Sequence, residues 1–163
     1  IGISTAKAIA YALGVKVVPV KTLDALAENC LNMGALICPV LDARRNEVYY
    51  GLYNENGEPL TESGAMDPLA LGEYIKEHYP CRKVIFLGDA ADIYIENMKD
   101  VLGDFALLAP PAIRVFMADS AAFYALKHID SAVTPHELKA FYLRASSAEK
   151  MREDKLRREN SKL

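Results

Sequence analysis

The sequence predicts an α/β fold in which helices flank a mixed β-sheet. Short apolar runs alternate along the chain with stretches of helical periodicity, as they do in α/β domains. One of these runs, Lys83–Leu87, is almost continuously apolar, which is typical of a strand buried on both faces. Two others, Ala35–Leu41 and Glu47–Tyr53, flank a tight charged turn, so we expect them to form antiparallel strands.

The first part of the chain predicts a helix, a strand and a second helix. We expect the first helix over Ile3–Leu13, with Ser4 or a neighbour as its cap and Gly14 at its end. The strand is expected at Lys16–Val20, and the second helix, capped by Thr22, ends near Asn29. Because the first helix is apolar nearly all round, we expect it to be buried on more than one side. It fits either a central helix of a larger domain or a partner interface.

The middle of the chain predicts a third antiparallel strand and then alternating helices and strands. Asn56 and Gly57 form a strong turn signal, after which Glu58–Ser63 can return as a strand. The later elements are expected as helix, strand, helix, strand and helix at Asp67–Tyr79, Lys83–Leu87, Tyr94–Leu102, Phe105–Leu108 and Val115–His128.

We expect one mixed sheet between Ala35 and Tyr142, with helices on its faces and Val84–Leu87 as a central strand. The side chains that alternate along one face of the second strand should be β-strand residues that are not exposed. These are Val48, Tyr50 and Leu52.

Composition excludes several functional classes. The chain has 163 residues with 25% charged residues and a net charge of −3, so bulk electrostatics does not favour nucleic acid. It has no apolar run of the roughly 20 residues that span a bilayer, and no membrane association is expected. Cys30, Cys38 and Cys81 are widely spaced without a C-x-x-C pair, which favours reduced thiols in a cytoplasm. The chain does not begin with Met, and we expect it to be a fragment.

No catalytic constellation is visible, so we expect no catalytic residue, no metal and no cofactor. His78, His128 and His136 lie far apart and are expected at the surface; no H-E-x-x-H or G-x-S-x-G motif occurs. Gly88 and Asp89 follow a predicted strand, where open α/β sheets bind ligands. The alternative is a plain turn that caps the next helix, and we favour that alternative.

The turn between the first two predicted strands, Asp42 to Glu47, raises the question of phosphate binding. A phosphate loop turns several backbone N–H groups toward one anion, which needs positive φ and usually glycine. Arg44 and Arg45 stand in those positions. Their side chains could bind an anion, or they could form a solvated tip that meets a partner.

The end of the chain is strongly charged, with seven basic and four acidic residues from Arg144 on. Few apolar side chains anchor it, so a solvated helix or a frayed tail over residues 146–163 is expected. A docking site for RNA or an acidic partner is the second interpretation.

Four stretches resemble one known family. The segment "IGISTAKAIAYALGVKVVPVKTLDALA" is similar to the region after the Gly-rich segment of the TsaB (also called YeaZ) family. "LDARRNEVYYGLY" resembles its D-A-R-x-x-E-V-Y turn, "IFLGDAADIY" its strand-plus-Gly segment, and "AFYLRASSAE" its closing Y-L-R-x-S-x-A-E signature. The first segment is shared more loosely with the catalytic paralogue TsaD. The matches follow the family's order.

The resemblance implies the actin-like ATPase (ribonuclease H-like) fold, built from two related halves. Residues 1–33 would be a remnant of the first half, 34–145 one complete second half, and 146–163 a tail. The family's N-terminal portion would be missing. In this fold the hairpin that opens the second half binds phosphate. Asp42, Arg44, Arg45 and Glu47 would then be a degenerate version of that turn that no longer binds ATP productively.

The resemblance also implies a function. The family is the dimerisation subunit of the bacterial machinery that makes N6-threonylcarbamoyladenosine at tRNA position 37. The implied role is a non-catalytic scaffold for a TsaD-like transferase, with a TsaE-like ATPase in the assembly, a possible homodimer and only indirect contact with tRNA. Older family names suggest a glycoprotease, but the chain shows no protease constellation. An active ATP-dependent enzyme of the actin-like superfamily, such as a small-molecule kinase, is the alternative.

The first helix is the expected interface, because the family pairs through helices of its first half. Ala8 and Ala12 with Tyr11 suit a close helix–helix approach, and Ser4 and Lys7 would lie at the rim. In this chain we expect the helix to be either disordered or packed against another copy.

Overall fold

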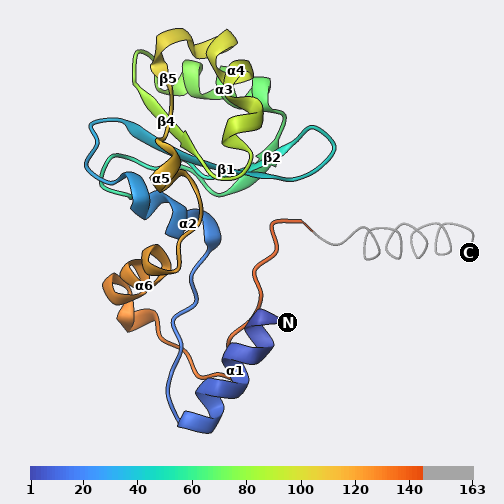
Figure 1. The fold of residues 1–163 in the computed structure, drawn as a ribbon, viewed down its shortest axis with the longest axis vertical. Coiled ribbons are helices and arrows are strands. Elements are labelled where there is room, and N and C mark those ends of the chain that lie inside the picture. The colour runs from blue at the N-terminus through green and yellow to red at the C-terminus, as the bar shows by residue number, and fades with distance from the viewer. Residues whose placement is uncertain (145–163) are drawn as a thin grey trace, which may run out of the picture.

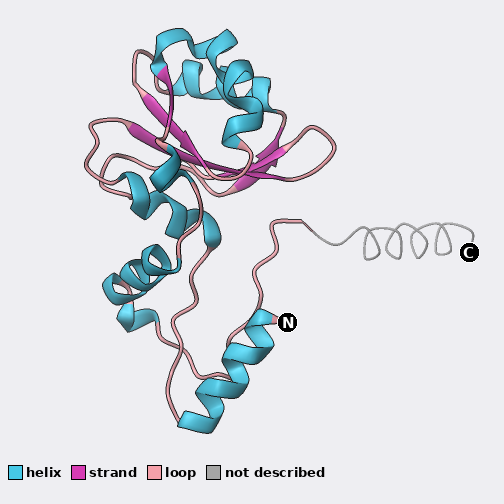
Figure 2. Cartoon of the chain, in the orientation of Figure 1, coloured by secondary structure: helices cyan, strands magenta, loops and turns pink. Residues whose placement is uncertain are grey.

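A five-stranded sheet forms the centre of the molecule (Figures 1 and 2). The computed structural model describes residues 1–144, so the predicted charged tail and the end of the closing signature lie outside the described residues. The strands stand in the order β3-β2-β1-β4-β5. Their bounds are Leu36–Asp42 for β1, Val48–Tyr50 for β2, Gly64–Met66 for β3, Val84–Leu87 for β4 and Ala106–Leu108 for β5.

The sheet is mixed, as predicted. Strand β2 pairs antiparallel with both β1 and β3, whereas β4 pairs parallel with both β1 and β5. Strand β4 is therefore interior, and all four of its residues are buried. Val48, Tyr50 and Leu52 are buried as well, which confirms the predicted inner face of the hairpin.

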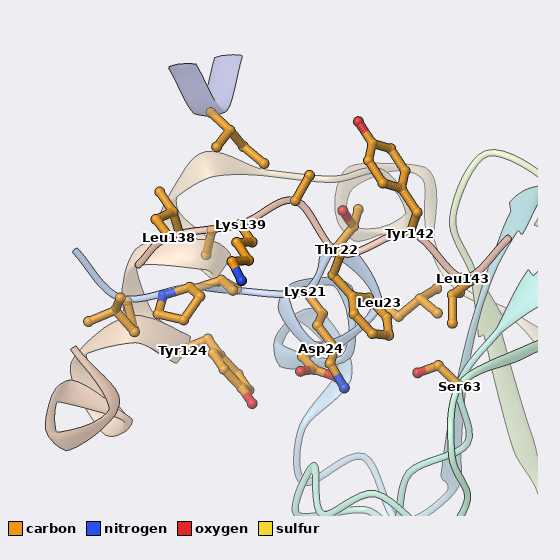
Figure 3. Close-up of a pocket in the computed structure, with 18 of the residues that line it drawn as sticks. Lys21, Thr22, Leu23, Asp24, Ser63, Tyr124, Leu138, Lys139, Tyr142 and Leu143 are labelled. Carbon is orange, nitrogen blue, oxygen red and sulfur yellow. The ribbon is translucent and has the colours of Figure 1, made fainter. Parts of the chain in front are cut away.

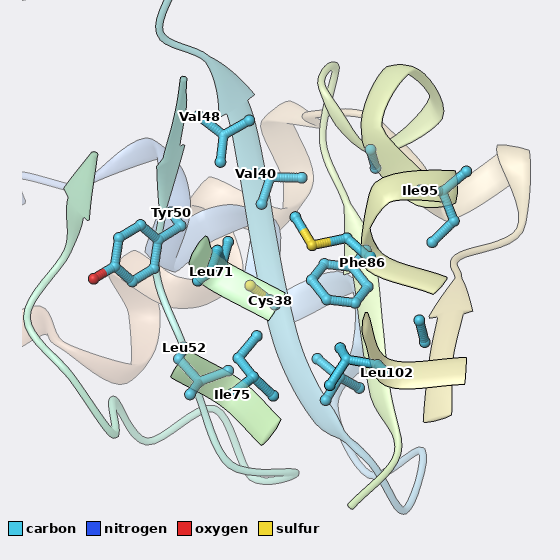
Figure 4. Close-up of a cluster of buried hydrophobic side chains, with 14 of the residues drawn as sticks. Cys38, Val40, Val48, Tyr50, Leu52, Leu71, Ile75, Phe86, Ile95 and Leu102 are labelled. Atoms are coloured by element: carbon cyan, nitrogen blue, oxygen red, sulfur yellow. The ribbon is translucent and has the colours of Figure 1, made fainter. Parts of the chain in front are cut away.

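Helices cover both faces of the sheet. Cys38 and Val40 of β1 pack with α3 (Pro68–His78) and α4 (Ala91–Leu102), as Figure 4 shows. Leu36, which points to the same face of β1, belongs to the same cluster. On the other face, Ile37 packs with α2 (Thr22–Ala27), the 3-10 helix η1 (Glu28–Cys30) and α5 (Pro111–Arg114). The two apolar layers explain why β1 and β4 are apolar on both faces.

Two further helices lie beyond this sheet unit. Helix α6 (Ala118–Lys127) packs on α2 and η1, and the 3-10 helix η3 (Ile129–Ser131) follows it. Helix α1 (Gly2–Leu13) lies apart from the sheet, with the segment 132–144 running back beside it (Figure 1). None of the helices formed by the described residues is both long enough and apolar enough to cross a membrane.

Local signals predicted several helix ends correctly. Asp67 is the N-cap of α3, and its carboxylate accepts hydrogen bonds from the backbone N–H groups of Leu69 and Ala70. Gly14 follows α1 in the left-handed conformation, with φ 65°. The predicted caps at Ser4 and Thr22 are wrong: α1 begins at Gly2 and α2 begins at Thr22 itself, and neither helix has a side-chain cap.

The strand predicted at Lys16–Val20 is wrong. Only Val17 makes a β-bridge, to Val133, and the residues around it have no neighbouring strand. The third antiparallel strand is Gly64–Met66 instead of Glu58–Ser63. Just before the predicted region, the Asn54 side chain accepts hydrogen bonds from the backbone N–H groups of Asn56 and Glu58 and holds a turn. Within the predicted region, Pro59 makes a single β-bridge, to Tyr53.

Other elements are shorter or shifted. The strand expected over Glu47–Tyr53 is regular only at β2, and Phe105 lies in the 3-10 helix η2 (Gly103–Phe105) before β5. The helix expected at Val115–His128 begins at Ala118, because the preceding prolines start the separate helix α5. Helix α4 begins at Ala91 instead of Tyr94.

Helix α1 is not buried on more than one side. Ala10 is its one buried residue, while Tyr11 is 82% exposed and Leu13 is 69% exposed. The helix is regular, so the expected disorder is wrong, and packing against a second copy stays a prediction. The boundary predicted between residues 33 and 34 also stays a prediction, although α2, which precedes it, packs on the sheet.

Candidate functional site

The hairpin turn between β1 and β2 has an unusual backbone. Arg44, Arg45 and Asn46 have φ values of 63°, 57° and 59°, so three successive residues without glycine adopt the left-handed conformation. Such a conformation costs about 1–2 kcal/mol for a residue with a side chain. The turn therefore adopts positive φ without glycine, and the expectation that positive φ here needs glycine is wrong.

Hydrogen bonds across the turn offset this cost. The Ala43 N–H donates to the Glu47 carbonyl over 3.0 Å, and the Glu47 N–H donates to the Arg44 carbonyl over 3.1 Å. The Asp42 carboxylate accepts the Arg44 N–H at 2.7 Å and pairs with the Arg44 guanidinium at 3.1 Å. The Arg44 charge is thus partly neutralised within the turn, whereas Arg45 is exposed and makes no ion pair with the described residues.

The two predicted sites, the turn at Asp42–Glu47 and the strand end at Gly88–Asp89, lie next to each other. The Asp89 carboxylate accepts a hydrogen bond from the Asp42 N–H at 3.0 Å. It does not cap α4, whose N-cap is Ala90 without a side-chain hydrogen bond, so the capping interpretation of Asp89 is wrong. Gly88 makes the turn at φ 101°, in a place where a Cβ atom would lie 2.1 Å from the Val40 carbonyl oxygen.

Sequence reasoning missed Arg144 as a member of this site. Its guanidinium pairs with the Glu47 carboxylate, 97 positions away in the chain. The two residues come from the D-A-R-x-x-E-V-Y and Y-L-R-x-S-x-A-E stretches, so the signal was present in both motifs. Neither motif, however, indicates that the two stretches are in contact in the folded chain.

A pocket of about 1040 Å³ adjoins this turn (Figure 3). Its walls come from the start of α2, from α6 and from the segment 138–144, with Leu41 and Tyr49 of the hairpin at one side. The Lys21 ammonium lies 4.7 Å from the centre of the Phe141 ring on its wall. Burial and the nearby Asp24 carboxylate raise the pKa of Tyr124 to about 12, so its phenol stays protonated at neutral pH.

Histidines and cysteines contribute no reactive group to this site. His78, His128 and His136 are exposed, as predicted. Cys30 and Cys38 are buried free thiols, and burial raises the pKa of Cys30 to about 11, which keeps it protonated and unreactive. Within residues 1–144, no group of three or more His, Cys, Asp or Glu side chains is arranged to hold a metal ion.

The five predicted interface residues of α1 differ in exposure. Ser4, Ala8, Tyr11 and Ala12 are exposed. Lys7 instead faces the segment 132–144, and its ammonium donates hydrogen bonds to the carbonyls of His136 and Leu138 at 3.4 Å and 3.0 Å. Lys7 thus attaches α1 to the segment 132–144 of the same chain.

Comparison with known proteins gives a consistent result. The family model described as "TsaD: tRNA N6-adenosine threonylcarbamoyltransferase" matches residues 1–139. The tRNA threonylcarbamoyladenosine biosynthesis protein TsaB of Bacillus subtilis (strain 168) is 31% identical over 150 residues, which cover 91% of this chain. The chain spans 65% of the length of that relative.

Two solved structures share the fold. One is described as a protein with similarity to peptidase YEAZ from Pseudomonas aeruginosa; it has a TM-score of 0.65 and 21% identity over 88% of this chain and 66% of its own. The other is YeaZ from Pseudomonas aeruginosa, with a TM-score of 0.64 and 20% identity over 86% of this chain and 66% of its own.

These likenesses confirm the resemblance to TsaB (YeaZ) and the actin-like, ribonuclease H-like fold with a mixed sheet flanked by helices. The two solved structures bear on the fold alone, because their sequence identity is low. The family model covers most of the chain, from its first residue to the segment beside α1. The chain therefore belongs to the TsaD family, described as tRNA N6-adenosine threonylcarbamoyltransferase.

Proposed function

We propose that this chain is part of a non-catalytic subunit that supports a TsaD-like threonylcarbamoyltransferase in the cytoplasm. The modification would be N6-threonylcarbamoyladenosine at tRNA position 37. The name of the Bacillus subtilis relative, a tRNA threonylcarbamoyladenosine biosynthesis protein, supports this pathway. The subunit would contact the transferase directly, a TsaE-like ATPase in the larger assembly, and tRNA only indirectly. The same surface could instead pair with a second copy of the chain.

The exposed face of α1 is the observation that carries this proposal. Tyr11 is 82% exposed, and Ala8 and Ala12 beside it leave room for another helix to approach. Exposed aromatic side chains surrounded by small residues are typical of interface cores, because they bury a large area at little entropic cost. Lys7, one helical turn before Tyr11, is held by the segment 132–144, so this segment borders the Tyr11 face but leaves Tyr11 exposed.

The turn between β1 and β2 supports a non-catalytic role. Arg44 is held by Asp42, and Glu47 is held by Arg144, so two charged groups of the turn already have partners within the chain. An incoming nucleotide phosphate would have to displace the first of these pairs or bind only at the exposed tip, through Arg45 and the backbone N–H groups beside it. We therefore expect ATP to bind weakly or not at all.

A pull-down of the full-length protein against the TsaD-like and TsaE-like proteins of the same organism tests the proposal. Ala8→Glu should weaken capture of the transferase, because a charge buried in an interface without a partner costs several kcal/mol. Ala6→Glu is the matched control: it places the same charge on an exposed position of the same helix, about half a turn away from Ala8.

Circular dichroism would verify that both variants are folded, and sedimentation of the mixed proteins would measure the association. Equal capture of the two folded variants would place the interface elsewhere. Failure of the unmodified full-length protein to bind the transferase would refute the proposal itself.

One observation favours the ATP-dependent enzyme as a second candidate. The positive φ values of the turn leave the backbone N–H groups of Arg45 and Asn46 without a hydrogen-bond partner among residues 1–144. Adjacent free N–H groups are able to bind an anion. A calorimetric titration of the full-length protein separates the two candidates: tight, magnesium-dependent ATP binding that Arg44→Ala abolishes would favour the enzyme.

A further inference from the structure

The segment 132–144 connects three parts of the chain that are distant in sequence. At its beginning, Val133 and Val17 exchange two backbone hydrogen bonds of 2.9 Å and 2.8 Å. The carbonyls of His136 and Leu138 accept hydrogen bonds from the Lys7 ammonium. The first half of the segment is therefore attached to α1, through Lys7, and to the stretch after α1, through Val17.

A local turn stiffens this first half. The Glu137 carboxylate accepts hydrogen bonds from the backbone N–H and the hydroxyl of Thr134, at 2.9 Å and 2.8 Å. The Glu137 N–H in turn donates to the Thr134 carbonyl at 3.1 Å. These bonds favour the ionised carboxylate, and they lower the pKa of Glu137. The ionised carboxylate, the form present at neutral pH, is the one that accepts both hydrogen bonds.

The second half of the segment is attached more weakly. Phe141 lies under the Lys21 ammonium, and Arg144 pairs with Glu47, whose side chain is 32% exposed. No backbone hydrogen bond from residues 139–144 to any other residue of the described chain accompanies these two contacts. Ion pairs and cation–π contacts that water reaches are individually weak. The attachment at Arg144 is therefore the end that can open first.

The weakly attached half forms one wall of the 1040 Å³ pocket. Residues Leu138 to Arg144 line it on one side, and the start of α2 with the Ala121 side of α6 lines it on the other (Figure 3). If Arg144 left Glu47, this wall would move and the pocket would open. The remaining contacts of the segment, at Val133 and Lys7, would still hold its first half.

We propose that residues 132–144 form a strap that closes this pocket, with the Glu47–Arg144 ion pair as its latch. Glu47 joins two structures: its backbone closes the left-handed turn through Ala43 and Arg44, and its side chain holds the strap. A change in the turn therefore changes access to the pocket. This device goes beyond the proposed function, because it operates within one chain and requires no partner.

Limited proteolysis with trypsin tests the latch in the whole chain. The measured quantity is the rate of cleavage after Lys139, which requires local opening of the strap. Glu47→Gln and Arg144→Gln should each raise this rate roughly fivefold, the factor expected for the loss of a partly exposed ion pair. Arg45→Gln is the matched control for Glu47→Gln, since it alters a charge in the same turn without touching the strap, and its rate should not change.

The charge-swapped protein, with Glu47→Arg and Arg144→Glu together, should return to the original cleavage rate. A second measurement reports on the pocket itself. In a Cys81→Ser background, the thiol introduced by Ala121→Cys should react faster with a soluble disulfide reagent when Glu47→Gln is present. Circular dichroism confirms folding of each variant.

Unchanged cleavage and labelling in folded single variants would overturn the proposal. So would a charge-swapped protein that stays as sensitive as the single variants, because the effect would then not depend on the ion pair.

Discussion

Gly88→Ala should be one of the most damaging single-methyl substitutions in this chain. Gly88 lies at the end of β4 with φ 101°, a conformation that residues with a side chain rarely adopt. The added Cβ would lie 2.1 Å from the Val40 carbonyl oxygen and 3.0 Å from the Val40 carbonyl carbon. Both contacts are with backbone of the middle strand, so no side chain can turn away to relieve them.

The expected loss of stability has three contributions. The backbone conformation costs about 1–3 kcal/mol for a residue other than glycine. Relief of the clash requires β1 and the β4 turn to separate, which weakens the hydrogen bond from the Ala90 N–H to the same Val40 carbonyl, at about 1 kcal/mol. Displacement of the buried Val40 adds lost packing, and the total loss should be about 3–5 kcal/mol.

Urea denaturation followed by circular dichroism measures this loss as a change in the free energy of unfolding. Gly34→Ala is the matched control, because Gly34 also has a positive φ, of 68°, but no atom lies within 4 Å of the added Cβ. The control should lose about 1–2 kcal/mol through its backbone conformation alone. A Gly88→Ala protein no less stable than Gly34→Ala would show that the close approach to Val40 is not what requires glycine.

Three further predictions concern single groups. Asp67→Ala should lower the free energy of unfolding by about 1 kcal/mol through the lost α3 cap, while Asp100→Ala on the exposed side of α4 should have little effect; equal values in urea denaturation would contradict the cap's role. Arg45→Gly should be about 1 kcal/mol more stable than Arg45→Ala, because only glycine relieves the positive φ of 57°, and equal stabilities would show that the turn is unstrained in solution. Burial raises the pKa of Cys30 from 9.0 to about 11, and that of Cys38 also rises, so both thiols are more easily ionised in the unfolded chain. The contribution of the thiols to the free energy of unfolding should therefore be constant below about pH 9 and should fall between pH 9 and pH 11. The measured fall should be smaller in the Cys30→Ala variant, and an equal fall in that variant would refute the assignment.

The α1 surface and the strap are linked through Lys7. The Lys7 ammonium reaches the carbonyls of His136 and Leu138, and the same segment continues to Arg144 at the hairpin turn. Ala8 is exposed and takes no part in these contacts, and Glu47 lies at the other end of the segment. The two proposals therefore make independent predictions: Ala8→Glu should change association without changing cleavage at Lys139, and Glu47→Gln should do the reverse.

The fold class and the elements with local signals were predictable from the amino-acid sequence. Strands β1 and β4 were predictable because a short, continuously apolar run has few alternatives to a strand buried on both faces. Helix α3 was predictable from Asp67 and Pro68, since a cap and a first-turn proline act within a few residues. The turn at Asp42–Glu47 and its charged tip were also visible, and so was the family, through motifs spread along the chain.

The contacts between these elements became visible in the folded chain alone. Neither the ion pair of Arg144 with Glu47 nor the hydrogen bond of Asp89 with the Asp42 N–H has a local signal, because each joins residues that are far apart in sequence. The left-handed turn is a further example: Arg44 and Arg45 have no intrinsic preference for positive φ, and the hydrogen bonds within and around the hairpin hold them there. The exposure of α1 also depends on distant parts of the chain, because an apolar helix is buried only where another part of the molecule lies close enough to cover it.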